Sequence, residues 1–481
     1  MTNKTLRKAA LTAAICAVSG GTFSSGAMAA GFALQESSAA GLGRAYAAEN
    51  TVGDTVGILA RNPAGSALFD TITVSGGFNY VNPEIDAAGY TQYFAETPIG
   101  DIALTAPIYQ EANDYASGAF VPFGFVAVPI DDCWSFGLSA NADYGLETDF
   151  KPTWAVTHIA DKTELLTVNI APSIAYNYQD VFSIGVSANF LYADATLKSK
   201  VPRDFALDPA LQQPLSDAKI LDASGDDWDY GWSIGALWNI SDRTRIGISY
   251  QSEFDPEIKA DVDSDLLTSV TTGLPFDNER ADLTLDLPDT AEIGLYHRFN
   301  DQWGLALGAT WTDWDDFERL EAFFPNQKIN GQPFPGYNPL HIKEENFKSG
   351  WRYSLGLEYY PCDEVTWRVG YAYDEGAARD GLYTEETDRV GRDVTWRTLS
   401  IPDNDRHWVT FGGSYEFSNQ LSIDGGVAYL WGDDSKIQEF SSLPVSFPTP
   451  AGTATALNTY FDGGTTNLEA WIAGVGLNYS F

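Results

Sequence analysis

The sequence contains little positive charge and little sulfur. Its 481 residues include 28 Lys and Arg against 66 Asp and Glu, which gives a formal net charge of −38. Because phosphate backbones are bound by Lys and Arg, this balance argues against a nucleic-acid partner. The three cysteines form no CxxC pair. We expect Cys133 and Cys362 to be free or buried thiols, and a disulfide between them stays open as the alternative.

Catalytic and metal-ligand patterns are also scarce. The four histidines are scattered without an HExxH spacing, and no Asp-x-Asp-x-Asp-Gly calcium loop is present. The carboxylates are too widespread for any two of them to stand out as an acid–base pair. We therefore predict that the protein is not an enzyme and that it holds neither a metal nor a cofactor.

Long apolar runs are missing after the first 29 residues. No later segment approaches the ~18–20 apolar residues that a membrane helix needs. Residues 1–29 have the features of a secretory signal peptide, because Lys4, Arg7 and Lys8 precede a short apolar stretch and a small-x-small cleavage site follows at 27–29. The sequence therefore predicts an exported chain that begins at residue 30.

Glycine and aromatic residues are abundant, with 44 Gly, 24 Tyr and 14 Trp, and many segments alternate between apolar and small or polar residues. Every second residue is apolar in 182–192, 303–311 and 351–359. Aromatic side chains often lie at the ends of such segments and aliphatic ones in the middle. That distribution is typical of strands that face lipid between two aromatic girdles, and less so of a soluble β-sandwich.

Fourteen such segments are predicted as strands, near residues 71–83, 118–129, 134–145, 164–178, 182–198, 229–240, 245–260, 281–299, 303–320, 347–360, 365–375, 405–417, 421–432 and 466–481. Short turns alternate with long polar loops, which we expect near 84–117, 146–163, 199–228, 261–280, 321–346, 376–404 and 433–465. An even strand count with this loop pattern is typical of bacterial outer-membrane barrels, and so is an alternating last strand that ends on Phe481.

We therefore predict an all-β fold, a 14-stranded antiparallel transmembrane β-barrel over residues 71–481. It would lie in the outer membrane of a Gram-negative bacterium, in contact with lipid and lipopolysaccharide. Residues 30–70 are rich in small residues and lack the alternation, so they form either a periplasmic extension or a plug inside the barrel. A barrel of about fourteen strands is wide enough to leave a channel unless something fills it.

Several motifs make the chain recognisable. They are GFALQESSAAGLGRAYA at 31–47, RNPAG at 61–65, DYGLETDF at 143–150, DWDYGWSIGALW at 227–238, LTLDLPDTAEIGLYHRF at 283–299 and SIPDNDRHW at 400–408. With these motifs the chain resembles the FadL family of outer-membrane transporters for long-chain fatty acids and other hydrophobic compounds. The resemblance covers essentially the whole chain after the signal peptide.

The resemblance implies a monomeric barrel in which residues 30–70 form a hatch. It implies passive uptake: a ligand is captured at an external apolar groove, moves to a tighter internal pocket and leaves sideways through a gap at a kinked third strand. The kink would lie around 141–146, where glycine and aspartate interrupt the alternation. An ordinary strand end is the alternative. The residues that the resemblance assigns to gating are Asn62, Pro63, Ala64, Asp143, Tyr144 and Gly145.

The external groove would be built by the loops near 199–228 and 261–280. Apolar side chains on acidic loops either pack on each other or bind an apolar ligand. The candidate groove residues are Phe205, Leu207, Leu211, Leu266, Leu267 and Phe276. Lys343 matches a position where the family places a base at the ligand head group. The family's second base does not align, because Ser199 stands there between Lys198 and Lys200, either of which could substitute by a shift.

The sequence thus favours uptake of long-chain fatty acids. Uptake of aromatic or aliphatic hydrocarbons by the same fold is the alternative, because it would not need the second base. A third possibility is a surface adhesin or phage receptor, for which long external loops would suffice.

Overall fold

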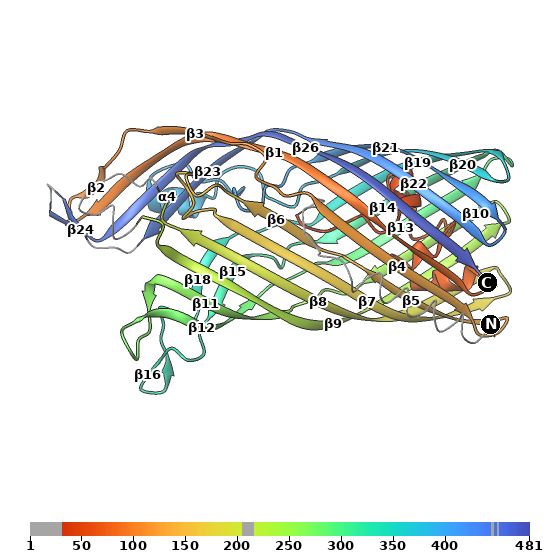
Figure 1. The fold of residues 1–481 in the computed structure, drawn as a ribbon, viewed down its shortest axis with the longest axis horizontal. Helices are drawn as coiled ribbons and strands as arrows, with labels where there is room; N and C mark the ends of the chain where they lie inside the picture. Colours follow the sequence, from red (N-terminus) through yellow and green to blue (C-terminus); the bar gives the residue numbers. More distant parts are fainter. Residues whose placement is uncertain (1–30, 204–215, 444–446, 450–451) are drawn as a thin grey trace.

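The computed structural model describes residues 31–203, 216–443, 447–449 and 452–481. Most of the chain after residue 72 is strand, and successive barrel strands pair antiparallel. The last strand, β26 (Ala456–Ser480), returns to pair with the first, β1 (Thr73–Thr97), starting at Thr73↔Ser480. This pairing closes the sheet into a barrel whose strands are tilted against the long axis (Figure 1).

Within the described residues the barrel has fourteen strands, some of which are made of two consecutive elements. In chain order they are β1, β4 (Ala119–Pro129), β5 (Trp134–Asn141) with β6 (Gly145–Asp149), β7 (Lys162–Tyr178), β8 (Phe182–Lys200), β9 (Lys219–Ser241), β10 (Thr244–Gln251) with β11 (Glu257–Thr268), β12 (Pro275–Thr284) with β13 (Asp289–Arg298), β14 (Trp303–Asp313) with β15 (Arg319–Phe323), β18 (Leu340–Glu344) with β19 (Gly350–Cys362), β20 (Val365–Asp374), β21 (Arg406–Ser418), β22 (Leu421–Gly432) with β23 (Ser435–Leu443), and β26. The predicted fold class is confirmed.

Smaller elements lie at the end of the barrel that carries the long connections. They are β2 (Gly100–Ala103), β3 (Ile108–Ala112), β16 (Lys328–Ile329), β17 (Gln332–Pro333), β24 (Phe447–Thr449), β25 (Gly452–Ala454) and the helix α4 (Thr384–Val390). Among the described residues, no helix combines the length and the apolarity needed to cross a membrane.

The alternating sequence pattern decides which side chains face outward. Phe182, Ile184 and Val186 of β8 are exposed on the barrel exterior, whereas Ser183 and Asn189 are buried inside. The same alternation holds along β20 and β21, where exposed aromatic and aliphatic residues share the outer face. The barrel therefore presents an apolar outer surface and a polar lumen.

Several predicted long loops are wrong in detail, because strands continue through them. Residues 84–97, expected as loop, extend β1 and pair with β26. The loop expected at 261–280 is largely the hairpin formed by β11 and β12. These stretches carry many polar residues because both of their faces leave the apolar belt. The polar residues of these stretches therefore indicate strands that are exposed to water on both faces, and not irregular backbone.

The N-terminal segment, residues 31–70, lies inside the barrel, toward the end where the C-terminus is found (Figure 1). It contains α2 (Ala39–Gly43) and the short 3₁₀ helices η1 (Val56–Ala60) and η2 (Pro63–Leu68). α2 contacts β20, β21, β22 and β26, while η1 and η2 contact the opposite wall. Glycines allow this close approach: a Cβ atom added to Gly370 would lie 2.3 Å from the backbone of Arg44, and one added to Gly43 would lie 3.0 Å from the Gly412 backbone.

Candidate functional site

The third barrel strand is interrupted in the middle of the wall. β5 ends at Asn141 and β6 begins at Gly145, so residues 142–144 belong to neither element. On one side, the ladder between β4 and β5 stops at Gly124↔Ala140, and pairing resumes as the isolated bridge Ala116↔Thr148. The predicted interruption is therefore present, and it leaves a gap in the ladder that we name the lateral gap.

The beginning of the N-terminal segment occupies the lumen side of this gap. Ala33 forms an isolated antiparallel bridge with Tyr144. The backbone N–H of Leu34 donates to the carbonyl of Asp143 at 2.7 Å, and the N–H of Gly145 donates to the carbonyl of Phe32 at 2.9 Å. Residues 32–34 thus act as a short extra strand that satisfies backbone groups left unpaired by the interruption.

Side chains also hold the interrupted residues in place. The Asp143 carboxylate accepts hydrogen bonds from Asn141 at 2.6 Å and from Asn169 at 2.7 Å. The Tyr144 hydroxyl donates to the carbonyl of Pro288 at 2.8 Å, on the far side of the lumen. The interruption is therefore an ordered feature of the wall.

An apolar cavity of about 70 Å³ lies beside the lateral gap. Phe32 of the N-terminal segment lines it together with Leu146 of β6 and Ile401 of the SIPDNDR motif. Phe32 also packs edge-on against Trp314 at 4.6 Å and Phe317 at 5.3 Å between ring centroids. Withdrawal of Phe32 would enlarge this cavity and uncover the gap at the same time.

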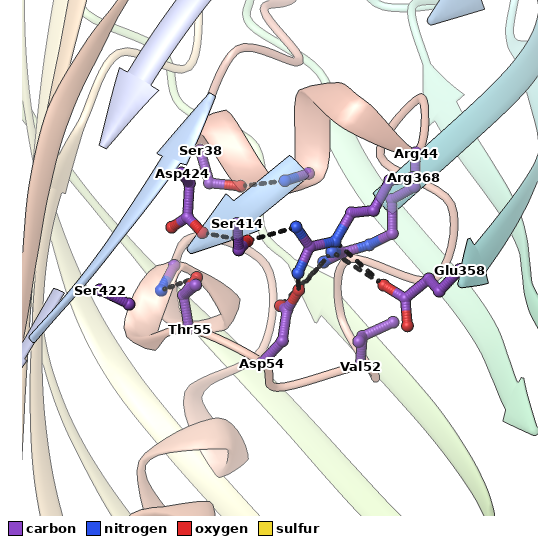
Figure 2. A network of polar contacts seen from close by, with 12 residues as sticks. Ser38, Arg44, Val52, Asp54, Thr55, Glu358, Arg368, Ser414, Ser422 and Asp424 are labelled. Atoms are coloured by element: carbon purple, nitrogen blue, oxygen red, sulfur yellow. Dashed lines mark hydrogen bonds and ion pairs between the residues drawn. The ribbon is translucent and has the colours of Figure 1, made fainter. Parts of the chain in front are cut away.

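The rest of the N-terminal segment is tied to the opposite wall by a buried ionic network (Figure 2). Arg44 lies 2.6 Å from Glu49 and 2.7 Å from Asp54. From the wall, Arg368 of β20 reaches Asp54 at 2.8 Å and Glu358 of β19 at 3.1 Å. The Arg368–Glu358 pair joins two neighbouring strands of the wall.

The predicted gating residues Asn62, Pro63 and Ala64 belong to this anchored part. The Asn62 side-chain amide donates to the carbonyls of Asn50 at 2.9 Å and Ala236 of β9 at 3.3 Å, and its oxygen caps η2 by accepting from the N–H of Ala64. A Cβ atom on Gly185 of β8 would collide with the backbone of Pro63 and Ala64. The structure thus separates Asn62, Pro63 and Ala64, which are packed on the wall, from Asp143, Tyr144 and Gly145 at the gap. A gating role for all six stays a prediction.

Lys343 lies in a second, more polar cavity of about 490 Å³. Its ammonium group donates to the Ser400 hydroxyl at 2.7 Å and lies 3.0 Å from a carboxylate oxygen of Glu439 on β23. Only 15% of the Lys343 side chain and 7% of the Glu439 side chain are exposed. Lys343 is therefore a largely enclosed cation with a carboxylate partner, and not a solvated loop charge.

Glu345, in the loop between β18 and β19, is buried behind this cavity. Burial raises the pKa of its carboxyl group to about 8, an effect that Lys343 opposes and Glu439 reinforces. Its Oε1 atom has no hydrogen-bond partner among the described residues. Burial therefore favours the protonated form of the group at neutral pH, since Lys343 offsets only part of the cost of burying the charge.

We expect the melting temperature of the purified protein in detergent to fall by a few degrees as the pH rises from about 5 to 9, and Glu345→Gln to remove much of that fall. The pKa in the folded state lies above the ordinary value of 4.5. The stabilisation is thus complete below pH 4.5 and is lost as the pH rises through about 8. Thermal unfolding followed by circular dichroism measures this. Glu344→Gln, at a less buried neighbour, should keep the wild-type profile, and an unchanged profile in E345Q would contradict the prediction.

The predicted groove residues are distributed over two clusters at the long-loop end. Leu266 packs beside Tyr93 and Leu457, whereas Leu267 and Phe276 pack in a cluster with Phe324. These side chains are therefore in contact with other apolar groups, and a ligand groove between them stays a prediction. Phe205, Leu207 and Leu211 lie outside the described residues.

Sequence reasoning missed the residues that connect the two cavities. Ser400 contacts Lys343, and Ile401 lines the apolar cavity. Asp403, two positions further on, accepts hydrogen bonds from the backbone N–H groups of Ala378 at 2.9 Å and of Gly31, next to Phe32. The SIPDNDR motif is visible in the sequence. Only the folded barrel shows that it contacts both Lys343 and the start of the N-terminal segment.

The structure also shows where a Gly-x-Ser-x-Gly spacing and the two remaining cysteines lie. Gly231–Gly235 has the spacing of a hydrolase nucleophile elbow, but it lies within strand β9 and Ser233 accepts a hydrogen bond from Asn189. An elbow needs a sharp strand-to-helix turn, so this segment is structural. Cys133 and Cys362 are both free and exposed.

Comparison with known proteins extends over the whole barrel. The family described as "Outer membrane protein transport protein (OMPP1/FadL/TodX)" matches residues 20–481. A long-chain fatty acid transport protein of Salmonella typhi is 31% identical over 499 residues that cover all of both chains. A crystal structure of a Pseudomonas aeruginosa FadL homologue shares the fold with a TM-score of 0.71 and 22% identity, covering 94% of this chain and 100% of that one. The Pseudomonas putida toluene transporter TodX aligns with a TM-score of 0.56 and 16% identity, over 94% and 100% of the two chains.

Proposed function

This chain belongs to the FadL family of outer-membrane transport proteins, and we propose that it takes up long-chain fatty acids by passive, hatch-gated diffusion with lateral release into the membrane. The observation that carries the proposal is the position of residues 32–34, which are hydrogen-bonded into the lateral gap. A short segment held by a few backbone hydrogen bonds can leave its place at modest cost, whereas a closed ladder cannot.

The proposed path uses the two cavities in order. A ligand enters from the long-loop end, places its head group near Lys343 and its chain among the apolar residues beside Phe32. Removing apolar surface from water supplies the driving force, at about 25 cal/mol per Å². Movement of residues 32–34 then opens the lateral gap, and the ligand leaves between β4 and the interrupted strand. In this proposal residues 31–70 act as the hatch, the protein works as a monomer, and no chemical step or cofactor is needed.

Uptake of aromatic or aliphatic hydrocarbons is the second candidate. The observation that favours it is the Lys343–Glu439 pair, because a cation that already has a carboxylate partner is a weaker attractant for a ligand carboxylate. A hydrocarbon would need only the apolar cavity. The external acidic loops and the lipid-facing exterior fit contact with lipopolysaccharide and lipid in either case.

We expect Lys343→Ala to reduce uptake of labelled oleate by roughly tenfold, since a charge-assisted contact to a buried carboxylate contributes about 1.5–3 kcal/mol. Uptake of labelled toluene should stay unchanged, because toluene has no charged head group. Both are measured in a transporter-deficient host that expresses the chain, with insertion of the barrel checked by its heat-modifiable migration.

The matched control is Lys436→Ala, an exposed lysine on β23, the strand that carries Glu439, which should leave both uptakes unchanged. Toluene uptake without oleate uptake in the wild type would replace fatty acids by hydrocarbons as the substrate class. Uptake of neither ligand by a correctly inserted barrel would contradict transport and leave a surface-receptor role.

A further inference from the structure

Lys343 and the two lysines that flank Ser199 each have a carboxylate partner from this chain. Lys343 lies 3.0 Å from Glu439, Lys198 lies 3.1 Å from Asp222, and Lys200 lies 3.0 Å from Asp161. A ligand carboxylate that approaches any of them therefore meets an ion pair and not a free cation.

Of the three pairs, Lys343–Glu439 is the most enclosed and faces the large cavity. Lys198 and Lys200 keep 40% and 23% of their side chains exposed, compared with 15% for Lys343. Exposed pairs are weak because water screens them, whereas a buried pair is strong once formed. Competition by an internal carboxylate therefore matters most at Lys343.

Glu439 is held in position from a second direction. Its Oε2 atom accepts a hydrogen bond from the backbone N–H of Leu399 at 2.8 Å, while Oε1 faces Lys343. Leu399 precedes Ser400, the other partner of Lys343. The carboxylate of Glu439 thus occupies a fixed site that offers a cation, a hydroxyl group and a backbone donor nearby, which is the set of groups that a ligand carboxylate would seek.

The rest of the cavity offers no compensating positive charge among its described lining residues. The other strongly basic side chain in the lining, Arg389 of α4, is bound by both carboxylate oxygens of Glu386. Glu344 adds a further carboxylate to the lining. An incoming anion must therefore either displace Glu439 from Lys343 or share the cation with it in an acidic surrounding.

We propose that Glu439 is a specificity-determining residue that acts as an internal competitor of the ligand carboxylate, so that it weakens the binding of fatty-acid anions and lets amphiphiles with a neutral polar head group bind at least as tightly. The inference deepens the proposed function and rests on it, because it concerns the same cavity. A long-chain alcohol can accept a hydrogen bond from Lys343 or Ser400 without breaking the Lys343–Glu439 pair. A carboxylate gains the full interaction only when that pair opens.

The test is direct binding of oleate and of oleyl alcohol to the purified full-length chain in detergent, by isothermal titration calorimetry. We expect the wild type to bind oleyl alcohol at least as tightly as oleate. Glu439→Gln should tighten oleate binding by about tenfold and leave oleyl alcohol binding within about twofold, because an amide keeps the bond to Leu399 but does not neutralise Lys343. Glu439→Ser carries the same expectation and serves if E439Q does not assemble into a heat-modifiable barrel.

Two controls test whether the effect comes from competition between Glu439 and the ligand carboxylate for Lys343. Glu386→Gln removes a carboxylate from the same cavity that is paired with Arg389 instead, and should not tighten oleate binding by as much. In a Lys343→Met background, E439Q should tighten oleate binding by clearly less than it does in the wild type, since only relief of repulsion remains when there is no cation to free.

The outcomes separate the inference from the proposed function. Oleate binding that is unchanged or weaker in both Glu439 variants, with oleyl alcohol still bound, overturns the competitor role and leaves the transport proposal intact. A wild type that prefers oleate by tenfold or more also overturns it. If neither ligand binds the wild type or any variant, the proposed function fails and the inference falls with it.

Discussion

A disulfide that joins Ala33→Cys to Tyr144→Cys is expected to lower uptake of labelled oleate to the background of the transporter-deficient host, a loss of roughly tenfold or more. The substitutions are made together with Cys133→Ser and Cys362→Ser, which remove the two exposed thiols. Reduction with dithiothreitol should restore uptake. The measurement is uptake in oxidised and reduced cells, with disulfide formation confirmed by mass spectrometry.

The geometry of the bridge makes this pair suitable. The backbone hydrogen bonds run from Leu34 to Asp143 and from Gly145 to Phe32, so Ala33 and Tyr144 face each other as a non-hydrogen-bonded antiparallel pair. Cα atoms in such pairs are about 4.5 Å apart, within the range that disulfides span. A covalent link at this point prevents residues 32–34 from leaving the lateral gap and should close the lateral exit.

Three controls accompany this experiment. Each single cysteine variant should transport under oxidising conditions, which shows that loss of the Tyr144 side chain is not the cause. A second disulfide, Ser66→Cys with Ser135→Cys, ties η2 to β5 where the two hydroxyl oxygens are 2.9 Å apart. This second disulfide also links the N-terminal segment to the wall, but at a point away from the lateral gap. It should therefore leave uptake near the wild-type level. Full uptake with the 33–144 disulfide formed would show that ligands leave by another route.

Arg44→Ala is expected to release the N-terminal segment from the wall and to make the barrel leak ions. Arg44 is almost fully buried and is bound in bidentate fashion by Asp54, in addition to its contact with Glu49. Removal of one partner from a buried ion pair costs about 3–5 kcal/mol. Without Arg44, Glu49 stays buried without a cation and Asp54 keeps only Arg368. We therefore expect a large rise in single-channel conductance in planar bilayers and faster proteolysis within residues 31–70.

Arg44→Lys should show a smaller rise, because an ammonium group keeps the charge but cannot reproduce the paired contacts of the guanidinium group. The matched control is Arg389→Ala, which removes an exposed arginine from its pair with Glu386 on α4 and should leave the conductance unchanged. An Arg44→Ala barrel as tight as the wild type would show that packing of α2 and of the 3₁₀ helices is sufficient to hold the segment.

The residues at the gap show how far local sequence can be interpreted. The interruption at 142–144 was expected from the family resemblance, whereas the aspartate and glycine at 143 and 145 by themselves fit an ordinary strand end equally well. Its closure by residues 32–34 was not predictable, because those residues carry no strand pattern and their partner is distant in the chain. Likewise Arg368 could be paired with Glu358, which faces it across neighbouring strands, whereas its second partner Asp54 comes from inside the lumen.

The sequence by itself determined that this chain is a closed barrel of fourteen strands with an apolar exterior, because period-two alternation and turn spacing are local properties that each strand expresses on its own. Only the tertiary structure decided which side chains meet inside the lumen. It brought Glu439 to Lys343, Ser400 between the two cavities, and Phe32 into the lateral gap. Which carboxylate meets which cation depends on strands that become neighbours only when the barrel closes around the N-terminal segment, and no local pattern encodes that.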